Sequence, residues 1–307
     1  MSSSARIIGV FCMLLMMSGV AWAEKPVSII TSFSILGDMV KSIGGNRVSV
    51  TALVGPNGDV HTYEPTPATA KSVSQADLVV VNGLGLEGWI DRLIKASGYH
   101  GTVAVASMGV KPRNMKDEDN GGQIITDPHA WQDIENGKIY VDNIARALTA
   151  IDPAGAAAYR SMADSYIMKL DELNIWVKSE FSAIPEQSRR MITSHDAFGY
   201  FGDAYGVKIL SPMGFSSESE ASAAEVKKLI RQIKKEKITA VFVENIIDPR
   251  MVQQIARESG ITVGGELYSD ALSKPDGPAP TYLDMFKNNV TKIVEAMKKG
   301  LPEGVPK

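Results

Sequence analysis

The chain has one cysteine, four histidines and a nearly balanced charge, and these features limit the classes of protein to which it can belong. Its one cysteine, Cys12, lies in an apolar segment that we expect to be removed, so the mature chain would have neither disulfides nor thiolate metal ligands. The formal net charge of −3 argues against a basic surface that binds nucleic acid or anionic lipid. With 22% charged and 44% hydrophobic residues, the composition indicates a globular protein with a sizeable core.

Residues 1–23 differ in character from the rest of the chain. Arg6 precedes an apolar run over residues 7–20, and Ala21-Trp22-Ala23 has the small-x-small pattern of a signal-peptidase site. The run is too short for a comfortable transmembrane span, although an uncleaved anchor is the alternative interpretation. We therefore predict a signal peptide over residues 1–23, cleaved before Glu24, and a periplasmic location.

Short apolar runs alternate with segments of helical periodicity, and this scheme occurs twice. The runs lack polar alternation, which is typical of strands buried on both faces in a parallel sheet. The strands are predicted over 27–30, 48–54, 78–81 and 103–106, then over 191–193, 207–210, 238–243 and 261–263. The helices are predicted over 33–43, 67–75 and 86–95, then over 197–205, 221–235, 249–259 and 281–299. The sequence thus predicts an α/β fold of two lobes, each with a mostly parallel four-stranded sheet flanked by helices.

The segment between the two halves predicts a long helix. From Pro153 to about residue 184 nothing breaks a helix, apolar residues recur at spacings of three and four, and Asp152 is a suitable N-cap. We predict one rigid helix over 153–184 that connects an N-terminal lobe, 24–152, to a C-terminal lobe, 185–307. Two helices with a break near Lys178 are the alternative. The preceding residues 111–126 are polar and aperiodic, which predicts a surface loop.

Histidine occurs at four positions, and three of them lie beside turn-forming residues. His61 and His195 each follow a predicted strand, and His129 precedes a further helix that is predicted to begin near Glu135. Because ligands of open parallel sheets bind at the carboxyl ends of the strands, these three imidazoles are expected to converge on the cleft between the lobes. Asp270 follows the last predicted strand and is the fourth candidate. His100 lies in a Gly-Tyr-His-Gly segment and is expected to be an ordinary surface residue.

Three imidazoles and one carboxylate favour a particular metal. This ligand set suits tetrahedral Zn²⁺, whereas Mn²⁺ and Mg²⁺ favour more oxygen ligands. Glu244 is placed to offset the remaining positive charge. Taken singly, each loop histidine is also compatible with an exposed hydrogen-bonding residue, and Asp270 with a turn former. Three aspartates near the histidines are alternative ligands: Asp59, Asp127 and Asp196. Asp127 and Asp196 are also candidates for groups that orient the neighbouring imidazoles.

Five stretches, in order along the whole chain, carry a resemblance to a known family. They are Thr31-Ser-Phe-Ser-Ile-Leu-Gly-Asp-Met, Gly58-Asp-Val-His-Thr-Tyr-Glu-Pro-Thr-Pro, Asp127-Pro-His-Ala-Trp, Ser194-His-Asp-Ala-Phe-Gly-Tyr-Phe and Leu267-Tyr-Ser-Asp-Ala-Leu. The chain resembles the metal-binding proteins of zinc/manganese ABC importers, the cluster A-I solute-binding proteins, in which one long helix bridges two βα lobes. The resemblance implies that the metal ligands are His61, His129, His195 and Asp270.

The resemblance also bears on the metal. Members selective for manganese or iron tend to have glutamate where this chain has His195, so the chain resembles the zinc-binding branch. Some members with three histidines and one aspartate take manganese as well. Many zinc members carry a long histidine-rich loop before the second ligand, whereas the corresponding residues 111–126 contain no histidine.

The expected function is therefore metal capture without catalysis. The protein would bind Zn²⁺ between its lobes as a monomer and deliver it to an inner-membrane ABC permease and its ATPase, with a periplasmic metallochaperone as a further candidate partner. A manganese-binding or mixed zinc and manganese importer component is the first alternative. A secreted zinc hydrolase, with Glu244 or Asp270 as the base, and a metal-binding adhesin or chaperone are the others. The hydrolase lacks support because neither an H-E-x-x-H nor a G-x-S-x-G motif occurs.

Overall fold

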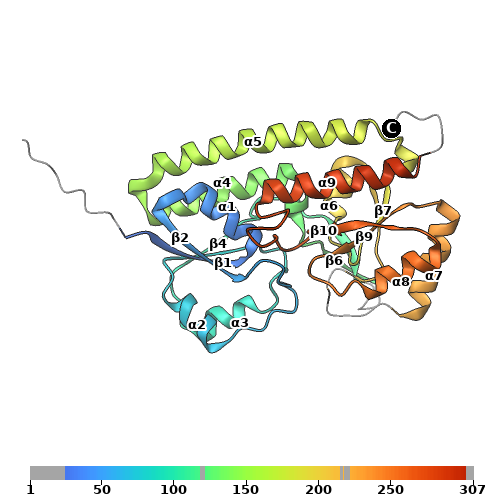
Figure 1. Ribbon diagram of the computed structural model, residues 1–307. Helices are drawn as coiled ribbons and strands as arrows, with labels where there is room; N and C mark the ends of the chain where they lie inside the picture. The colour runs from blue at the N-terminus through green and yellow to red at the C-terminus, as the bar shows by residue number, and fades with distance from the viewer. Residues whose placement is uncertain (1–24, 118–121, 215–216, 218–221, 302–307) are drawn as a thin grey trace, which may run out of the picture.

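The computed structural model describes residues 25–117, 122–214, 217 and 222–301. The signal peptide predicted over residues 1–23 lies outside this part of the chain. Two four-stranded sheets and a two-stranded hairpin form the described structure, and a long helix runs along both sheets (Figure 1). The predicted α/β architecture of two lobes joined by one helix is confirmed.

The N-terminal sheet is parallel throughout, in the order β2-β1-β3-β4. Its central strands are rich in β-branched residues, and every residue of the apolar strand β3 is buried, as expected of a strand covered on both faces. The strands are β1 (Val27–Phe33), β2 (Val48–Val54), β3 (Leu78–Val81) and β4 (Thr102–Val105). The helices are α1 (Ser34–Gly44) and α4 (Ile134–Ile151) on the side of the long helix, and α2 (Pro67–Ser74) and α3 (Ile90–Ser97) opposite (Figure 1).

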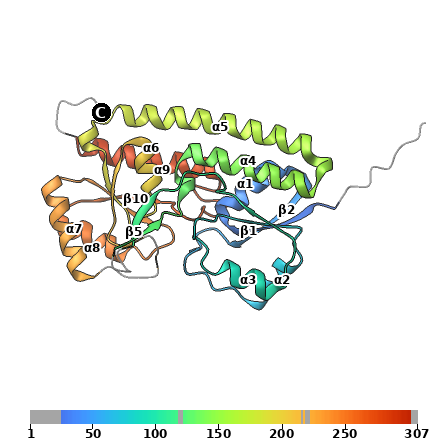
Figure 2. The same ribbon diagram turned by 180° about the vertical axis from the view of Figure 1, so that it is seen from behind.

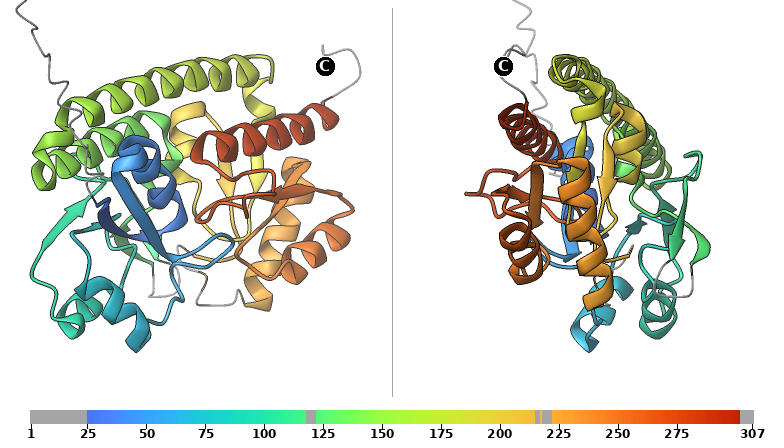
Figure 3. Two further views of the ribbon diagram at one scale, coloured as in Figure 1. Left: turned by 60° about the vertical axis from the view of Figure 1, so that its left-hand side comes forward. Right: turned by 90° about the vertical axis from the view of Figure 1, so that its right-hand side faces the viewer.

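The C-terminal sheet has the order β10-β9-β7-β8 and is also parallel. Its strands are β7 (Arg190–Ile192), β8 (Lys208–Leu210), β9 (Ala240–Glu244) and β10 (Val263–Leu267). One face packs against α6 (Gly199–Tyr205) and α9 (Tyr282–Lys299), and the other against α7 (Ala223–Glu236) and α8 (Arg250–Ser259) (Figure 3).

The predicted position of the last strand, 261–263, was wrong by several residues, because β10 spans Val263–Leu267. Two glycines in the strand obscure its apolar pattern. A Cβ at Gly264 would lie 2.6 Å from the Phe242 ring, so close packing of β10 against β9 requires glycine there. Gly265 has a φ of 136°, which accompanies the irregular register between Val263 and Glu266.

The long helix is α5 (Ala156–Ser182), 27 residues in one piece, so the alternative of a break near Lys178 was wrong. A 3-10 turn, Pro153–Gly155, precedes it, and Asp152 caps this turn by accepting the Gly155 N–H. The helix lies against α1 and α4 of one lobe and α6 and α9 of the other (Figures 1 and 2). The lobe boundaries 24–152 and 185–307 stay a prediction.

The surface loop predicted over residues 111–126 is in part a β-hairpin. Strand β5 (Asn114–Asp117) pairs antiparallel with β6 (Gln123–Thr126). The sequence shows no clear strand signal here because most of the hairpin's side chains are polar, and Ile124 is 63% exposed. The side chain of Met115 is nevertheless buried, so the hairpin packs against the body of the protein.

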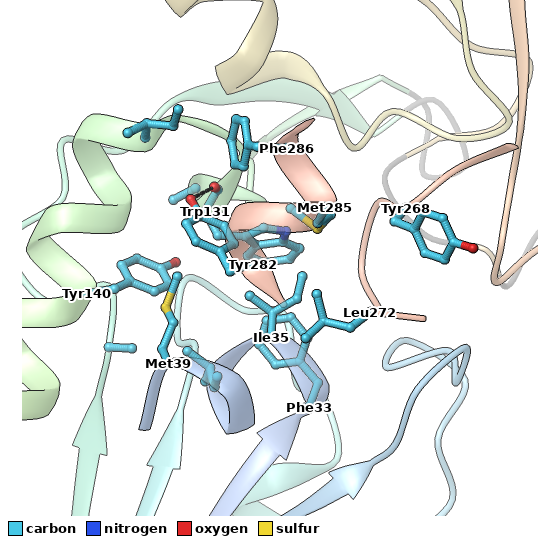
Figure 4. Close-up of a cluster of buried hydrophobic side chains, with 14 of the residues drawn as sticks. Phe33, Ile35, Met39, Trp131, Tyr140, Tyr268, Leu272, Tyr282, Met285 and Phe286 are labelled. Atoms are coloured by element: carbon cyan, nitrogen blue, oxygen red, sulfur yellow. Dashed lines mark hydrogen bonds between the residues drawn. The ribbon is translucent and has the colours of Figure 1, made fainter. Parts of the chain in front are cut away.

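The larger of two hydrophobic clusters continues from one lobe into the other, and the smaller one lies in the C-terminal lobe. Phe33 and Trp131 of the N-terminal lobe have ring centroids 5.0 Å apart, and Tyr282 and Phe286 of α9 lie beside them (Figure 4). The Tyr282 hydroxyl donates a hydrogen bond to the Trp131 carbonyl. This shared core holds the facing sheet edges at a defined separation. Within the described residues, no helix combines the length and apolar character needed to cross a bilayer.

Candidate metal site

The four predicted ligand residues reach one place from four different segments. His61 lies in the loop after β2, and His129 directly precedes the 3-10 helix η3 (Ala130–Gln132). His195 and Asp270 follow β7 and β10 of the other lobe. Since the strands of each sheet are parallel, their carboxyl ends share an edge, and the two edges face each other across the lobes.

The ligand atoms form a compact buried cluster. Each of the four residues offers one nitrogen or oxygen atom, and these atoms lie within 4.8 Å of one another. Asp270 Oδ2 is 3.1 Å from both His61 Nε2 and His195 Nε2, and 3.9 Å from His129 Nε2. His61 has 8% of its surface exposed, and the other three have none. The structure therefore brings together all four residues predicted as ligands, two from each lobe.

The donor set fits a divalent cation. The second oxygen of Asp270, Oδ1, is buried and has no hydrogen-bond partner among the described residues. A carboxylate oxygen without a partner is costly in a protein interior unless a cation approaches it. Three imidazole Nε2 atoms around the same carboxylate supply the nitrogen donors that Zn²⁺ and related metals bind.

His129 is oriented by Asp127, as one of the predicted alternatives proposed. Asp127 Oδ1 lies 2.9 Å from His129 Nδ1 and also accepts the His129 backbone N–H at 3.0 Å. Its other oxygen accepts a hydrogen bond from Arg113 Nη1 at 3.0 Å. A carboxylate on Nδ1 fixes the tautomer and turns Nε2 toward the metal.

His195 is oriented by Glu244, for which the sequence suggested charge balance or, in the hydrolase alternative, the role of a base. Glu244 Oε2 lies 2.7 Å from His195 Nδ1, while Oε1 accepts the backbone N–H groups of Ser194 and His195. Asp196, the residue predicted for this role, is not the partner of His195 Nδ1. Glu244 ends β9, so its position at the same sheet edge was the available signal.

The remaining candidates lie outside the cluster. Asp59 accepts the His61 backbone N–H at 2.9 Å and a hydrogen bond from the Ser217 hydroxyl. It shapes the loop that carries His61 rather than joining the ligand atoms. His100 is exposed, as predicted.

The charges of the cluster stabilise one another. Burial alone would raise the pKa of Asp270, but the neighbouring His195 and His129 hold it well below its usual range. Burial alone would lower the pKa of His195, but Glu244 and Asp270 raise it well above its usual value. Without a metal, the raised pKa favours the imidazolium form of His195, so a metal ion would compete with a proton there.

The fold and this site define a two-lobed protein with a buried cluster of potential metal ligands between its lobes. The family described as "Zinc-uptake complex component A periplasmic" matches residues 29–296, and the chain belongs to this family. Membership makes the chain a metal-binding component of an ABC importer and not an enzyme. The alternative of a secreted zinc hydrolase is thereby set aside.

Named relatives cover nearly the whole chain. The manganese-binding lipoprotein MntA of Halalkalibacterium halodurans is 36% identical over 282 residues, 92% of each chain. The manganese ABC transporter substrate-binding lipoprotein PsaA of Streptococcus pneumoniae is 32% identical, covering 90% of this chain and 91% of the relative. The iron-binding protein YfeA of Yersinia pestis is 32% identical, covering 88% of this chain and 86% of the relative.

Solved structures are similar over the same length. A Mn-bound variant of the periplasmic metal binding protein from Candidatus Liberibacter asiaticus has a TM-score of 0.81 and 34% identity, covering 88% of this chain and 99% of that one. The periplasmic zinc binding protein TroA from Treponema pallidum has a TM-score of 0.83 and 28% identity, covering 89% and 99%. The names span manganese, iron and zinc, so the comparisons support the family and do not assign the zinc branch.

Proposed function

We propose that this chain captures Mn²⁺ or Zn²⁺ outside the cytoplasm and delivers it to the permease and ATPase of its importer. The buried cluster of three imidazoles and one aspartate is the observation that carries this proposal. Both lobes contribute to the cluster, so the ion would be enclosed between them. Four protein ligands would leave no position for a reactive water, as suits binding without catalysis.

Two lines of support point to different cargo ions. The relatives named above are mostly manganese or iron proteins, which favours Mn²⁺. Three nitrogen donors favour Zn²⁺, and divalent metals at a given site follow an affinity order in which Mn²⁺ lies below Zn²⁺. We infer that the site accepts both ions and holds Zn²⁺ more tightly at equilibrium.

Asp270 gives a physical reason why one site can serve both ions. With one Asp270 oxygen bound, the site offers three nitrogen donors and one oxygen donor, which is the number of ligands that tetrahedral Zn²⁺ prefers. Its free second oxygen, Oδ1, can add a fifth donor for Mn²⁺, which favours oxygen ligands and higher coordination. The cargo in the cell would then depend on which ion is available.

The cellular context completes the proposal. We propose a periplasmic monomer, exported by the signal peptide of residues 1–23 and organised as lobes 24–152 and 185–307 around the connecting helix 153–184. Its partners would be an inner-membrane ABC permease and its ATPase, with a periplasmic metallochaperone as a candidate donor of metal.

The test is a metal titration of the purified apoprotein, followed by competition between the two ions. We expect the parent protein to bind one ion per chain and Zn²⁺ to displace Mn²⁺. We expect His129→Ala to lose the binding of both ions. His100→Ala is the matched control, since this histidine is exposed and lies outside the cluster. His195→Glu replaces a nitrogen with oxygen and should shift the preference toward Mn²⁺. Undiminished binding in His129→Ala would refute the proposed site.

A further inference from the structure

One guanidinium connects a metal ligand of the N-terminal lobe with a helix of the other lobe. Arg113 Nη1 donates to Asp127 Oδ2 at 3.0 Å, and Asp127 in turn holds His129 Nδ1. Arg113 Nε donates to Asp203 Oδ2, also at 3.0 Å, and Asp203 belongs to α6. The two arms of the guanidinium thus bind carboxylates on opposite sides of the lobe boundary.

Backbone hydrogen bonds reinforce the same connection. Arg113 directly precedes β5 and Asp127 directly follows β6, so both residues stand at the base of the hairpin. The Asp127 N–H donates to the Arg113 carbonyl at 2.8 Å. Tyr200 of α6 accepts the Arg113 N–H at 2.8 Å, and its hydroxyl donates to the Asp127 carbonyl at 3.3 Å. The base of the hairpin is therefore attached to α6 at several points.

Gly199 makes room for this contact. A Cβ at this position would lie 2.3 Å from Arg113 Nη1 and 2.6 Å from Asp127 Oδ2, too close for any larger residue without displacement. Gly199 is also the first residue of α6 and stands four positions after the ligand His195. The guanidinium therefore packs against the segment that carries a ligand of the opposite lobe.

We propose that Arg113 is a positioning residue that ties His129 to α6 and thereby sets how long the metal ion stays bound. This inference rests on the proposed metal-binding function and assigns a residue that governs release. A carboxylate behind a ligand histidine orients the imidazole, and the guanidinium fork fixes that carboxylate in turn. Lysine cannot replace the fork, because its single ammonium cannot hold both carboxylates in this planar geometry.

The test compares metal release from Arg113→Met with release from a matched variant, Arg47→Met. Arg47 also donates two hydrogen bonds to a carboxylate, that of Asp152, at 2.8 and 2.9 Å. The two arginines are similarly exposed, 28% for Arg113 and 35% for Arg47. We expect Arg113→Met to raise the Kd for Zn²⁺ by about tenfold, no more than removal of Asp127 itself would, mainly through faster release to a chelator. Arg47→Met should lower only the melting temperature.

Further variants separate positioning from a merely structural role. Arg113→Lys should recover only part of the affinity, and Asp203→Asn should raise the Kd less than Arg113→Met does. Combining Asp203→Asn with Arg113→Met should add nothing, because both changes break the same link. The visible spectrum of bound Co²⁺ should change in Arg113→Met and stay unchanged in Arg47→Met.

Equal Kd values and release rates in Arg113→Met and Arg47→Met would overturn the inference while leaving the metal site intact. A parent protein that binds neither Zn²⁺ nor Mn²⁺ would instead overturn the proposed function. The two failures are therefore distinguishable in the same experiment.

Discussion

In both halves of the site a carboxylate supports a ligand histidine, but the charge around that carboxylate differs between the halves. In the N-terminal half, the carboxylate behind the ligand is Asp127, and Arg113 neutralises it. In the C-terminal half, the carboxylate behind the ligand is Glu244, which accepts backbone N–H groups and, among the residues that the structure describes, forms no ion pair with an arginine or lysine. Asp270 adds a second buried carboxylate to this half alone.

This asymmetry indicates which half of the site balances the charge of a bound ion. Arg113 pairs with the buried Asp127 and with the exposed Asp203, so the carboxylate behind His129 is offset by a guanidinium, and the N-terminal half supplies two nitrogen donors to the ion. Glu244 and Asp270 together carry two negative charges, which match one divalent cation once the His195 proton has left. Because an uncompensated buried charge is costly, the C-terminal half should contribute most to binding the cation.

The largest expected effect is that of removing the ligand carboxylate. Asp270→Asn should raise the Kd for Zn²⁺ roughly a thousandfold, about 4 kcal/mol, because a buried cation loses its directly bound negative charge. Isothermal titration measures the change, and circular dichroism of the apoprotein controls for folding. A Kd within tenfold of the parent value would show that Asp270 is not a ligand.

The next effect compares the two carboxylates that support histidines. Glu244→Gln removes an unneutralised charge and should raise the Kd by about 100-fold, the upper end expected for such supporting groups. Asp127→Asn removes a charge that Arg113 already cancels and should cost only about tenfold. Equal losses, or a larger loss in Asp127→Asn, would contradict the asymmetry.

The smallest expected effect is the release of a proton when the metal ion binds. Since the pKa of His195 lies well above its usual value without metal, binding at pH 7 should release about one proton. Affinity should rise roughly tenfold per pH unit until the pH passes that pKa. The same shift stabilises the apoprotein fully below pH 6.5, and this contribution is lost as the pH rises through the raised pKa.

Calorimetry in buffers of different ionisation enthalpy counts the released proton. Glu244→Gln should reduce the release, since it removes one of the two groups that raise the pKa of His195. Asp127→Asn is the control and should leave the count unchanged. Release that is lost in Asp127→Asn instead would assign the proton to the N-terminal half.

Much of the fold was predictable from the sequence because its signals are local. Apolar, β-branched runs such as Leu78–Val81 indicate buried strands wherever they occur, and the uninterrupted periodicity after Pro153 indicates a long helix. The prediction was wrong for β10 and incomplete for the hairpin of β5 and β6. Glycines in one and polar residues in the other hide the strand pattern, while long-range pairing decides both.

The supporting groups of the site were harder to predict. Asp127 stands two positions from His129, so sequence proximity made it a candidate. Glu244 lies 49 positions from His195, and Arg113 lies 90 positions from Asp203. Nothing local marks such residues, because their roles depend on which sheet edges and helices meet.

By itself, the amino-acid sequence determined the alternation of strands and helices and the candidate donors: three loop histidines and one aspartate. These are chemical properties of residues and short-range periodicities, which exist before any folding. Only the tertiary structure decided that the four donors share one buried point, that Glu244 and Arg113 stand behind them, and that the two halves differ in charge. Such distances arise when two sheets pack around a common core, and chain separation along the sequence does not specify them.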